Sequence, residues 1–364
     1  MKVTFPHMGT MSIPVKSMLK ELGLEVVVPP PITKKTLDLG VKHSPEFACL
    51  PLKMNVGNYI EALEQGADTI LMGGGVGPCR FGYYGEVQEE ILEDLGYDFE
   101  MIILEPLQGD WKELFKTIKL LVGNIAITKI KSAWQKGWAK AKAVDQLNRI
   151  ANQTRSYLIN RYRASEVYER GLKLIRQAET IEEVETKVGL IEEEFNNLER
   201  DEDFEPLKVG LVGEIYVVLE PFTNLQIEKK LGEKGVLVDK SIYLTDWMEG
   251  HLFPSFLKRD QEGKKVKEVA QPYLNHFVGG HGLESVGETV LYSQKGYDGV
   301  VQLFPFTCMP EIIAESILPT VSRDLNIPVL SLTMDEHTGE AGYVTRLEAF
   351  IDLLERKSRK EKVI

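Results

Sequence analysis

The residues of this chain best suited to chemistry are its three cysteines, Cys49, Cys79 and Cys308. The thiolate is the form of cysteine that binds metal, and it is favoured at a helix N-terminus, where unpaired backbone N–H groups and the helix dipole stabilise negative charge. Cys79 and Cys308 each follow an apolar segment and precede a stretch of helical periodicity. The sequence therefore predicts that both lie at the carboxyl edge of an α/β sheet, beside the start of a helix.

The spacing of the cysteines matches no familiar metal motif. Intervals of 30 residues (49 to 79) and 229 residues (79 to 308) fit no zinc finger, thioredoxin pair or contiguous ferredoxin run. Spacing alone favours free, buried thiols, because cysteine packs as a small hydrophobic residue. Equivalent positions in two repeated domains favour a metal site instead, and three thiolates would leave a tetrahedral metal or a cubane iron with one open position.

Such a repeat is visible in the sequence. The segment Glu64–Met72 resembles Ser293–Gln302, since both contain a helix end, a glycine, an aspartate and then an apolar strand. Cys79 and Cys308 lie 13 and 12 residues, respectively, after the glycine of their own copy. The two cysteines are therefore expected at equivalent sheet edges of two related domains.

Two regions of the chain alternate short apolar runs with helical periodicity, which is typical of a parallel sheet covered by helices. In the first region strands are predicted at Val3–Phe5, Val26–Val28, Thr69–Met72 and Glu100–Leu104, with helices at Ser12–Leu22 and Glu86–Leu95. The pattern restarts with the strand Leu207–Gly213 and a helix around 224–232. We predict an α/β fold with two related parallel-sheet domains of the Rossmann or flavodoxin type, joined by a helical segment. The predicted boundaries are 1–125 for the domain with Cys49 and Cys79, 126–205 for the helical segment and 206–364 for the domain with Cys308.

The helical segment divides into two parts of opposite charge. Residues 128–163 contain nine basic residues and one acidic residue, whereas residues 164–204 contain five basic and thirteen acidic residues, which gives net charges of +8 and −8. The simpler interpretation is an antiparallel pair of complementary helical faces. The alternative is a basic arm that captures the phosphates of a ligand or an acidic partner.

The composition excludes several classes of protein. The chain has 364 residues, 43 Lys and Arg against 55 Asp and Glu, and a net charge of −12, which argues against a nucleic-acid-binding protein that works through bulk positive charge. An odd number of cysteines disfavours a disulfide scaffold and fits a reducing compartment. No signal-peptide pattern is present, and nowhere do about 18 apolar residues follow one another, so a cytoplasmic protein without a membrane span is expected.

Five motifs make the chain recognisable in combination. They are Ala48-Cys49-Leu-Pro-Leu-Lys53, Gly77-Pro-Cys79-Arg80-Phe-Gly82, Pro305-Phe-Thr-Cys308-Met-Pro310, Leu330-Ser-Leu-Thr-Met-Asp-Glu-His-Thr-Gly-Glu-Ala-Gly342 and Thr345-Arg346-Leu-Glu-Ala-Phe350. These motifs resemble the 2-hydroxyacyl-CoA dehydratase superfamily, and most closely its branch of acyl-CoA dehydratase activase-related (CoA-substrate-specific enzyme activase-like) proteins. The resemblance covers nearly the whole chain apart from the helical segment.

The resemblance implies an oxygen-sensitive 4Fe–4S cluster held by Cys49, Cys79 and Cys308, with one iron open to substrate or water. It also implies a separate ATP-dependent activator protein, with its own 4Fe–4S cluster, that delivers one electron at low potential for the reduction or radical dehydration of a small molecule or an acyl-CoA. Pairing of two subunits follows from the likeness alone. A larger double-cubane cluster would need more thiolates than this chain has. Two other hypotheses stay open: a non-catalytic electron-transfer or scaffold protein that carries a cluster, and a metal-free binding module with buried thiols.

Three further residues are candidates for a catalytic role. Arg80 would neutralise the cluster or bind an anion, although a surface ion pair explains it equally well. His281 lies in the Gly-Gly-His-Gly motif that starts at Gly279, the position that corresponds to Cys49 when residues are counted back from the repeat glycine. It would be a proton donor, or simply a loop histidine bonded to backbone. Glu340 would position a substrate, or lie in a solvated loop.

Overall fold

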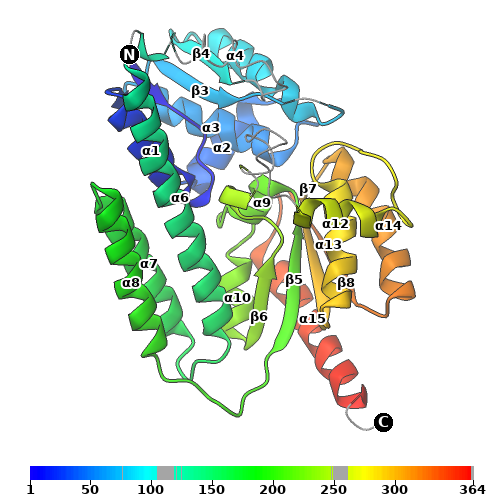
Figure 1. Ribbon diagram of the computed structural model, residues 1–364. Coiled ribbons are helices and arrows are strands. Elements are labelled where there is room, and N and C mark those ends of the chain that lie inside the picture. Colours follow the sequence, from blue (N-terminus) through cyan, green and yellow to red (C-terminus); the bar gives the residue numbers. More distant parts are fainter. Residues whose placement is uncertain are drawn as a thin grey trace. The chain divides into compact units, whose positions relative to one another are not determined.

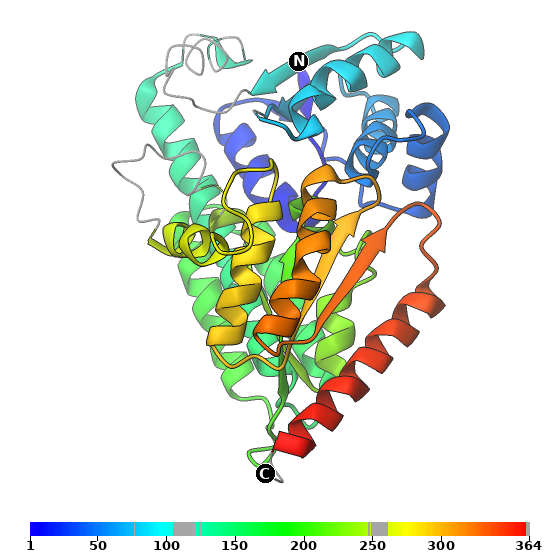
Figure 2. The same cartoon turned by 90° about the vertical axis from the view of Figure 1, so that its right-hand side faces the viewer.

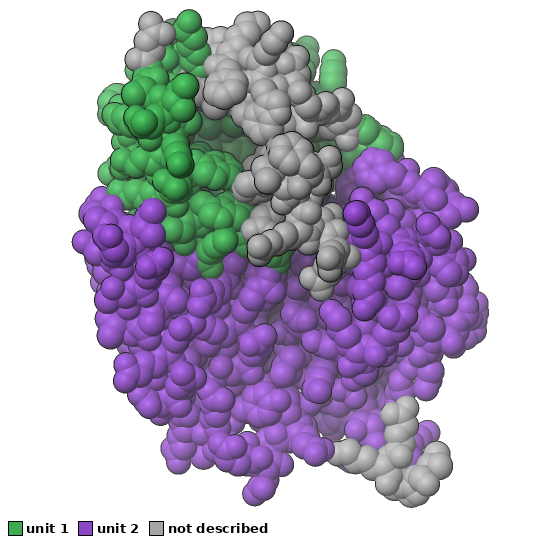
Figure 3. All heavy atoms as spheres, viewed as in Figure 1, with its two compact units in different colours: residues 1–142, 244–259 green, residues 143–243, 260–364 purple. Residues whose placement is uncertain are grey.

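The computed structural model describes residues 1–75, 77–104, 119, 121–123, 125–246, 248 and 261–361 (Figure 1). The chain forms two compact units, Met1–Lys142 with Leu244–Arg259 and Ala143–Tyr243 with Asp260–Ile364 (Figure 3). Each unit contains one four-stranded sheet in which every strand pair is parallel. The predicted fold class, α/β with two parallel sheets, is confirmed.

The first unit contains a sheet with the strand order β2-β1-β3-β4. Its strands are β1 (Lys2–Thr4), β2 (Glu25–Val26), β3 (Thr69–Gly73) and β4 (Glu100–Leu104). Its helices are α1 (Ser12–Glu21), α2 (Lys34–His43), α3 (Leu50–Glu64) and α4 (Tyr84–Asp94), with short 3-10 turns η1 (Gly9–Met11) and η2 (Arg80–Tyr83). All four strands predicted for this region are therefore present.

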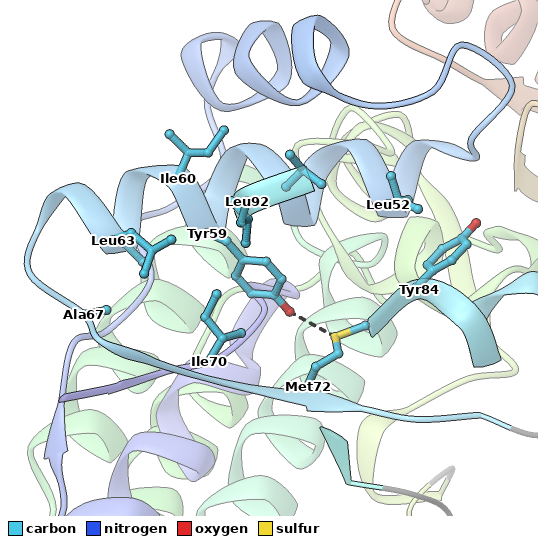
Figure 4. Close-up of a cluster of buried hydrophobic side chains, with 11 residues drawn as sticks. Leu52, Tyr59, Ile60, Leu63, Ala67, Ile70, Met72, Tyr84 and Leu92 are labelled. Carbon is cyan, nitrogen blue, oxygen red and sulfur yellow. Dashed lines mark hydrogen bonds between the residues drawn. The ribbon is translucent and has the colours of Figure 1, made fainter. Parts of the chain in front are cut away.

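The core of the first unit forms where α3 and α4 pack on β3. Every residue of α3 except its last is buried, which is why its sequence lacks a clear amphipathic pattern. The Tyr59 hydroxyl at the centre of this helix donates a hydrogen bond of 3.0 Å to the Met72 sulfur (Figure 4). Ile70 and Leu92 complete the buried cluster around that ring. The cluster ties α3 to the strand that leads toward Cys79.

The second unit repeats this plan with the strand order β6-β5-β7-β8. Its strands are β5 (Leu207–Gly213), β6 (Val236–Lys240), β7 (Gly299–Pro305) and β8 (Val329–Met334). Its helices outside the helical segment are α9 (Ile215–Leu219), α10 (Ile227–Glu233), α12 (Gln261–Ala270), α13 (Gly282–Gln294), α14 (Met309–Asp324) and α15 (Glu340–Glu361). Figure 2 shows α13 and α14 side by side on one face of the sheet. Strand β7 is buried along its whole length, as expected for the centre of a parallel sheet covered by helices.

The repeat extends to individual hydrogen bonds. In the first unit the Lys2 backbone N–H donates to the Asp68 carboxylate at 2.6 Å, and in the second the Lys208 N–H donates to Asp298 at 2.7 Å. In each copy the aspartate lies two residues after the glycine that ends the preceding helix. An equivalent carboxylate therefore binds the N-terminal end of the equivalent strand, the first residue of β1 and the second of β5.

A glycine allows two helices to approach closely in each copy. A Cβ atom added to Gly57 in α3 would lie 1.9 Å from the Thr36 carbonyl oxygen of α2, and one added to Gly287 in α13 would lie 2.3 Å from the Val266 carbonyl oxygen of α12. Both glycines lie nine residues before the glycine that follows their helix. The two helix pairs thus use the same contact at the same register.

The helical segment consists of α6 (Ile127–Arg155), α7 (Tyr162–Gln177) and α8 (Ile181–Asn196). The basic part is mainly α6, which begins in the first unit and ends in the second. The acidic part contains the α7–α8 pair, which Arg170 and Glu194 link by an ion pair. A Cβ atom on Gly171 of α7 would meet Leu147 of α6 and Ile191 of α8, so the three helices pack closely here. Within the described part of the chain, no helix has the length and apolar character that crossing a membrane requires.

Candidate functional site

All three cysteines occupy the same kind of position, the N-cap residue of a helix. Cys49 precedes α3, Cys79 precedes η2 and Cys308 precedes α14, each with extended backbone and no capping hydrogen bond from its sulfur. An N-cap side chain faces the N–H groups of the first helical turn, which have no partner within the helix. The chain therefore places each thiol where a thiolate is electrostatically favoured.

Cys49 reaches its N-cap position because α3 begins earlier than the sequence indicates. The sequence pattern indicates a helix only from about Val56, whereas α3 starts at Leu50, directly after the cysteine. Pro51 occupies its first turn, where the missing N–H would have had no helical partner. Proline occupies the same turn of α14, after Cys308. Cys-x-Pro is thus a shared signal for a cysteine that caps a helix.

Cys79 follows a glycine-rich loop at the carboxyl end of β3. A Cβ atom on Gly82 would lie 2.5 Å from the Gly75 carbonyl oxygen, so the loop crosses the Cys79 turn at a distance that only glycine allows. Gly77, two residues before the cysteine, has a φ of 109°, which also favours glycine. The loop packs the η2 turn tightly against the end of the strand.

Cys308 lies at the carboxyl end of β7, as predicted. Its N–H donates to the Pro305 carbonyl at 3.0 Å, while the Phe306 N–H donates to the Met334 carbonyl of β8 at 2.8 Å. Between them Thr307 adopts a φ of 68°, a left-handed conformation that β-branched residues rarely occupy. Backbone of this kind is concentrated at functional sites, where it fixes the direction of a neighbouring side chain. Cys308 is buried, with 7% of its surface exposed.

The structure brings Cys49, Cys79 and Arg80 together around Tyr84, the first residue of α4. Tyr84 Oη and Cys49 Sγ share a hydrogen bond. Arg80 donates from Nη1 to the Phe47 carbonyl at 3.0 Å, which connects the Cys79 turn to the loop that leads to Cys49. Burial chiefly raises the pKa of Tyr84, the charge of Cys49 and Cys79 raises it further, and Arg80 opposes them. The phenol is therefore protonated and within electrostatic range of both thiols.

Sequence reasoning missed Tyr84. The only available signal was a Tyr-Tyr pair four and five residues beyond Cys79. One member of that pair, Tyr83, is 67% exposed, whereas Tyr84 is 6% exposed. Only the helical phase of α4 distinguishes them, and this phase depends on where the helix begins.

His281 stands in the second unit where Cys49 stands in the first. It is the N-cap residue of α13, and α13 precedes β7 as α3 precedes β3. Counting back from the repeat glycine had matched Cys49 with Gly279. The structure shifts the match by two residues, because α13 has 13 residues and α3 has 15. A histidine, rather than a thiol, thus caps the equivalent helix.

Glu340 begins α15 and is exposed. Its carboxylate forms an ion pair with Lys230 at 2.8 Å, and the hydrogen bond and charge of this lysine lower the pKa of Glu340. The residue is therefore engaged in a surface ion pair, and its role in positioning a substrate stays a prediction.

A buried polar network lies behind Cys308 in the second unit. Glu311, the third residue of α14, is completely buried and accepts hydrogen bonds of 3.0 Å from Ser285 and 2.9 Å from the Gln302 amide. Ser331 donates in turn to the Gln302 carbonyl oxygen at 2.8 Å. Burial raises the pKa of the Glu311 carboxyl to about 8, against the lowering effect of these hydrogen bonds. The second unit thus holds a proton near neutral pH, a feature that the sequence did not reveal because its members are scattered over four elements.

The predicted metal ligands belong to both units. Cys49 and Cys79 lie in the first unit and Cys308 in the second. Among the residues that the structure describes, no group of three or more His, Cys, Asp or Glu side chains is close enough to hold a metal ion. The 4Fe–4S cluster is therefore still a prediction.

Comparison with known proteins supports part of the resemblance. A family model described as "CoA enzyme activase uncharacterised domain (DUF2229)" matches residues 7–73. This part of the chain is similar to a CoA enzyme activase domain. The match begins after β1, includes Cys49 and ends with β3, before Cys79. None of the curated proteins compared with the chain matches it. The activase-related likeness is thus supported for one portion of the first unit.

Proposed function

We propose that this chain is an iron–sulfur protein that binds one 4Fe–4S cluster through Cys49, Cys79 and Cys308 and uses it in a low-potential reduction or radical dehydration. The observation that carries the proposal is the position of the cysteines: each of the three caps a helix, and no sulfur is used as a capping acceptor. Thiols that only pack in a protein core need not lie at helix N-termini. Thiolates that bind a metal must carry negative charge, and a helix N-terminus stabilises that charge.

The donor set fits a cubane with one open iron. Three thiolates satisfy three of its four irons, and hydrogen bonds and helix termini around the sulfurs stabilise the added charge of a reduced cluster. When bound, the cluster would supply one-electron chemistry to a ligand at the open iron. The match to a CoA enzyme activase domain over residues 7–73 supports the same class of function.

The side chains around the thiols have separate tasks in this proposal. Arg80 places a positive charge within electrostatic range of the Tyr84–Cys49 pair, as its effect on Tyr84 shows, and would bind an anionic group of the substrate. His281 would hold a proton at the end of α13, where Cys49 has its counterpart. The substrate is a small molecule or an acyl-CoA. The electron comes from an ATP-hydrolysing partner protein with its own 4Fe–4S cluster.

Iron and acid-labile sulfide analysis after strictly anaerobic purification tests the proposal. The parent protein should contain about four irons and four sulfides per chain, and each of Cys49→Ser, Cys79→Ser and Cys308→Ser should lose most of them. Met309→Leu, a conservative change beside Cys308 at an exposed position, is the matched control and should keep its iron. Three serine variants with as much iron as the parent would show that the cluster hypothesis is wrong.

The same preparation distinguishes the two remaining hypotheses. A parent protein without iron, whatever its cysteines, would indicate the metal-free binding module. If iron is present, the EPR spectrum of the reduced cluster decides between enzyme and carrier. A spectrum that acyl-CoA esters or other small molecules perturb supports an enzyme, whereas an inert spectrum favours an electron carrier or scaffold.

A further inference from the structure

Tyr84 occupies a fixed position beside one of the three thiols. Figure 4 shows its side chain beside Leu52, at the N-terminal end of α3 that Cys49 caps. Phe81 packs edge-on against the Tyr84 ring at a centroid distance of 5.9 Å. The ring is buried in the same apolar cluster that contains Met72, so packing limits where its hydroxyl group can lie.

The hydroxyl group is used in a hydrogen bond to sulfur. Tyr84 Oη and Cys49 Sγ are hydrogen-bonded, and either atom can be the donor while Cys49 is a thiol. A metal-bound cysteine is a thiolate, which has no proton and can only accept. Ligation of Cys49 therefore fixes the direction of this bond, with the tyrosine O–H as donor.

The second copy of the fold has no such donor at the equivalent position. Tyr84 lies 12 residues before Gly96, the residue of positive φ that follows α4, and Ala314 lies 12 residues before Asn326, its counterpart after α14. Ala314 is completely buried and has no polar side-chain atom. The repeat therefore does not require a tyrosine here, and its presence is specific to the site with two thiols.

We propose that Tyr84 is a positioning residue that donates a hydrogen bond to the Cys49 thiolate and thereby raises the reduction potential of the cluster. The inference depends on the proposed function, because it concerns a ligand of that cluster. A donor to a ligand sulfur stabilises the reduced state more than the oxidised state, since the reduced cluster carries one more negative charge. The bond also fixes the direction of the sulfur at the end of α3.

The test compares two adjacent tyrosines. Tyr84→Phe removes the hydroxyl and keeps the ring, while Tyr83→Phe makes the same change at an exposed position and is the matched control. Iron content and the midpoint potential from an EPR-monitored redox titration are measured for the parent and both variants. In Tyr84→Phe we expect one-electron reduction to become about tenfold less favourable, a midpoint about 59 mV more negative, because a hydrogen bond to a charged group is lost. Tyr83→Phe should match the parent.

The outcomes separate this inference from the function on which it depends. Full iron in all three proteins with equal potentials overturns the role of Tyr84 and leaves the cluster intact. A parent without iron overturns the proposed function, and the inference with it. If Tyr84→Phe alone loses its iron, 3-fluorotyrosine at position 84 provides the second variant, because it keeps the shape and is a stronger donor. A less negative midpoint then supports the inference, and an unchanged or more negative midpoint overturns it.

Discussion

The two α/β units share one frame, a parallel sheet with its covering helices, but they differ in the side chains near the carboxyl edge of that sheet. The strand orders and the capping aspartates are the same in both. In the first unit, Met72 of β3 accepts a hydrogen bond from a tyrosine within an apolar cluster. In the second, Gln302 occupies the equivalent position of β7, six residues after the repeat glycine, and binds Glu311 and Ser331. One copy of the frame has an apolar cluster against which Cys49 packs, and the other has a buried carboxyl group that holds a proton, three residues after Cys308.

This difference shows that the frame and the chemistry are specified by separate residues. Glycines and aspartates at helix crossings and strand starts recur at the same register, because any second copy of the sheet needs them. The side chains that face the sheet edge do not recur. Cys49 and His281 are the N-cap residues of equivalent helices, yet one copy has a thiol there and the other an imidazole. Internal repetition is therefore a guide to where a site lies and a poor guide to what it does.

The largest expected effect concerns the proton in the second unit. The pKa of the Glu311 carboxyl is about 8 in the folded protein, against an ordinary value of 4.5 for a glutamate side chain. Between these pH values the folded state binds more protons than the unfolded state, so stability falls as the pH rises. Glu311→Gln imitates the protonated carboxyl and removes this dependence. From pH 5 to pH 8 the free energy of unfolding of the variant should increase relative to the parent by about 3 kcal/mol.

Urea unfolding at several pH values measures this difference. Glu340→Gln is the control, because its carboxylate is exposed, and its difference from the parent should change little over the same range. A difference between Glu311→Gln and the parent that stays constant from pH 5 to pH 8 would contradict a buried proton on Glu311. The first unit would then not differ from the second in this respect.

The next prediction concerns the close helix crossing that both units share. Gly57→Ala and Gly287→Ala each place a methyl group against a backbone carbonyl of the neighbouring helix, at 1.9 and 2.3 Å. Backbone cannot rotate away as a side chain can, so the helices must separate. Each substitution should lower the free energy of unfolding of its own unit by about 2–3 kcal/mol. Hydrogen exchange resolved by peptide locates the loss in α2 and α3 or in α12 and α13.

A third glycine provides the control. Gly189 lies inside α8 with no atom within 4 Å of an added Cβ, so Gly189→Ala should stabilise its helix by about 1 kcal/mol. If Gly57→Ala or Gly287→Ala behaves like Gly189→Ala, the close helix crossing is not a common element of the two units.

The frame could be predicted from the sequence because it depends on local signals. Apolar runs of strand length, followed by helical periodicity, located all four strands of the first sheet, and Leu207–Gly213 is β5 as predicted. The helix end, glycine, aspartate and strand in Glu64–Met72 and Ser293–Gln302 identified the repeat. That repeat placed Cys79 and Cys308 after equivalent strands, β3 and β7.

The parts of the site that could not be predicted depend on tertiary packing. Helix α3 is buried on all sides, so its first turn lacked the amphipathic pattern by which a helix start is recognised, and the N-cap position of Cys49 was missed. Tyr84 contacts a residue 35 positions away, and no periodicity reports such a contact. Ser285 and Glu311 are polar residues at helical positions, and such residues normally face solvent. Their burial follows only from the way α13 and α14 pack on the sheet.

The smallest expected effect concerns the turns that lead to the two equivalent cysteines. Gly77 has a φ of 109° before Cys79, and Thr307 has a φ of 68° before Cys308. Because a Cβ atom is disfavoured in both conformations, glycine should be more stable than alanine at both positions by about 1 kcal/mol. Comparing Gly77→Ala with the parent, and Thr307→Gly with Thr307→Ala, separates the backbone effect from loss of the threonine hydroxyl. Urea unfolding is the measurement. If Thr307→Gly is no more stable than Thr307→Ala, the turn before Cys308 is not held in a strained conformation, and the two turns differ as much as their sequences indicate.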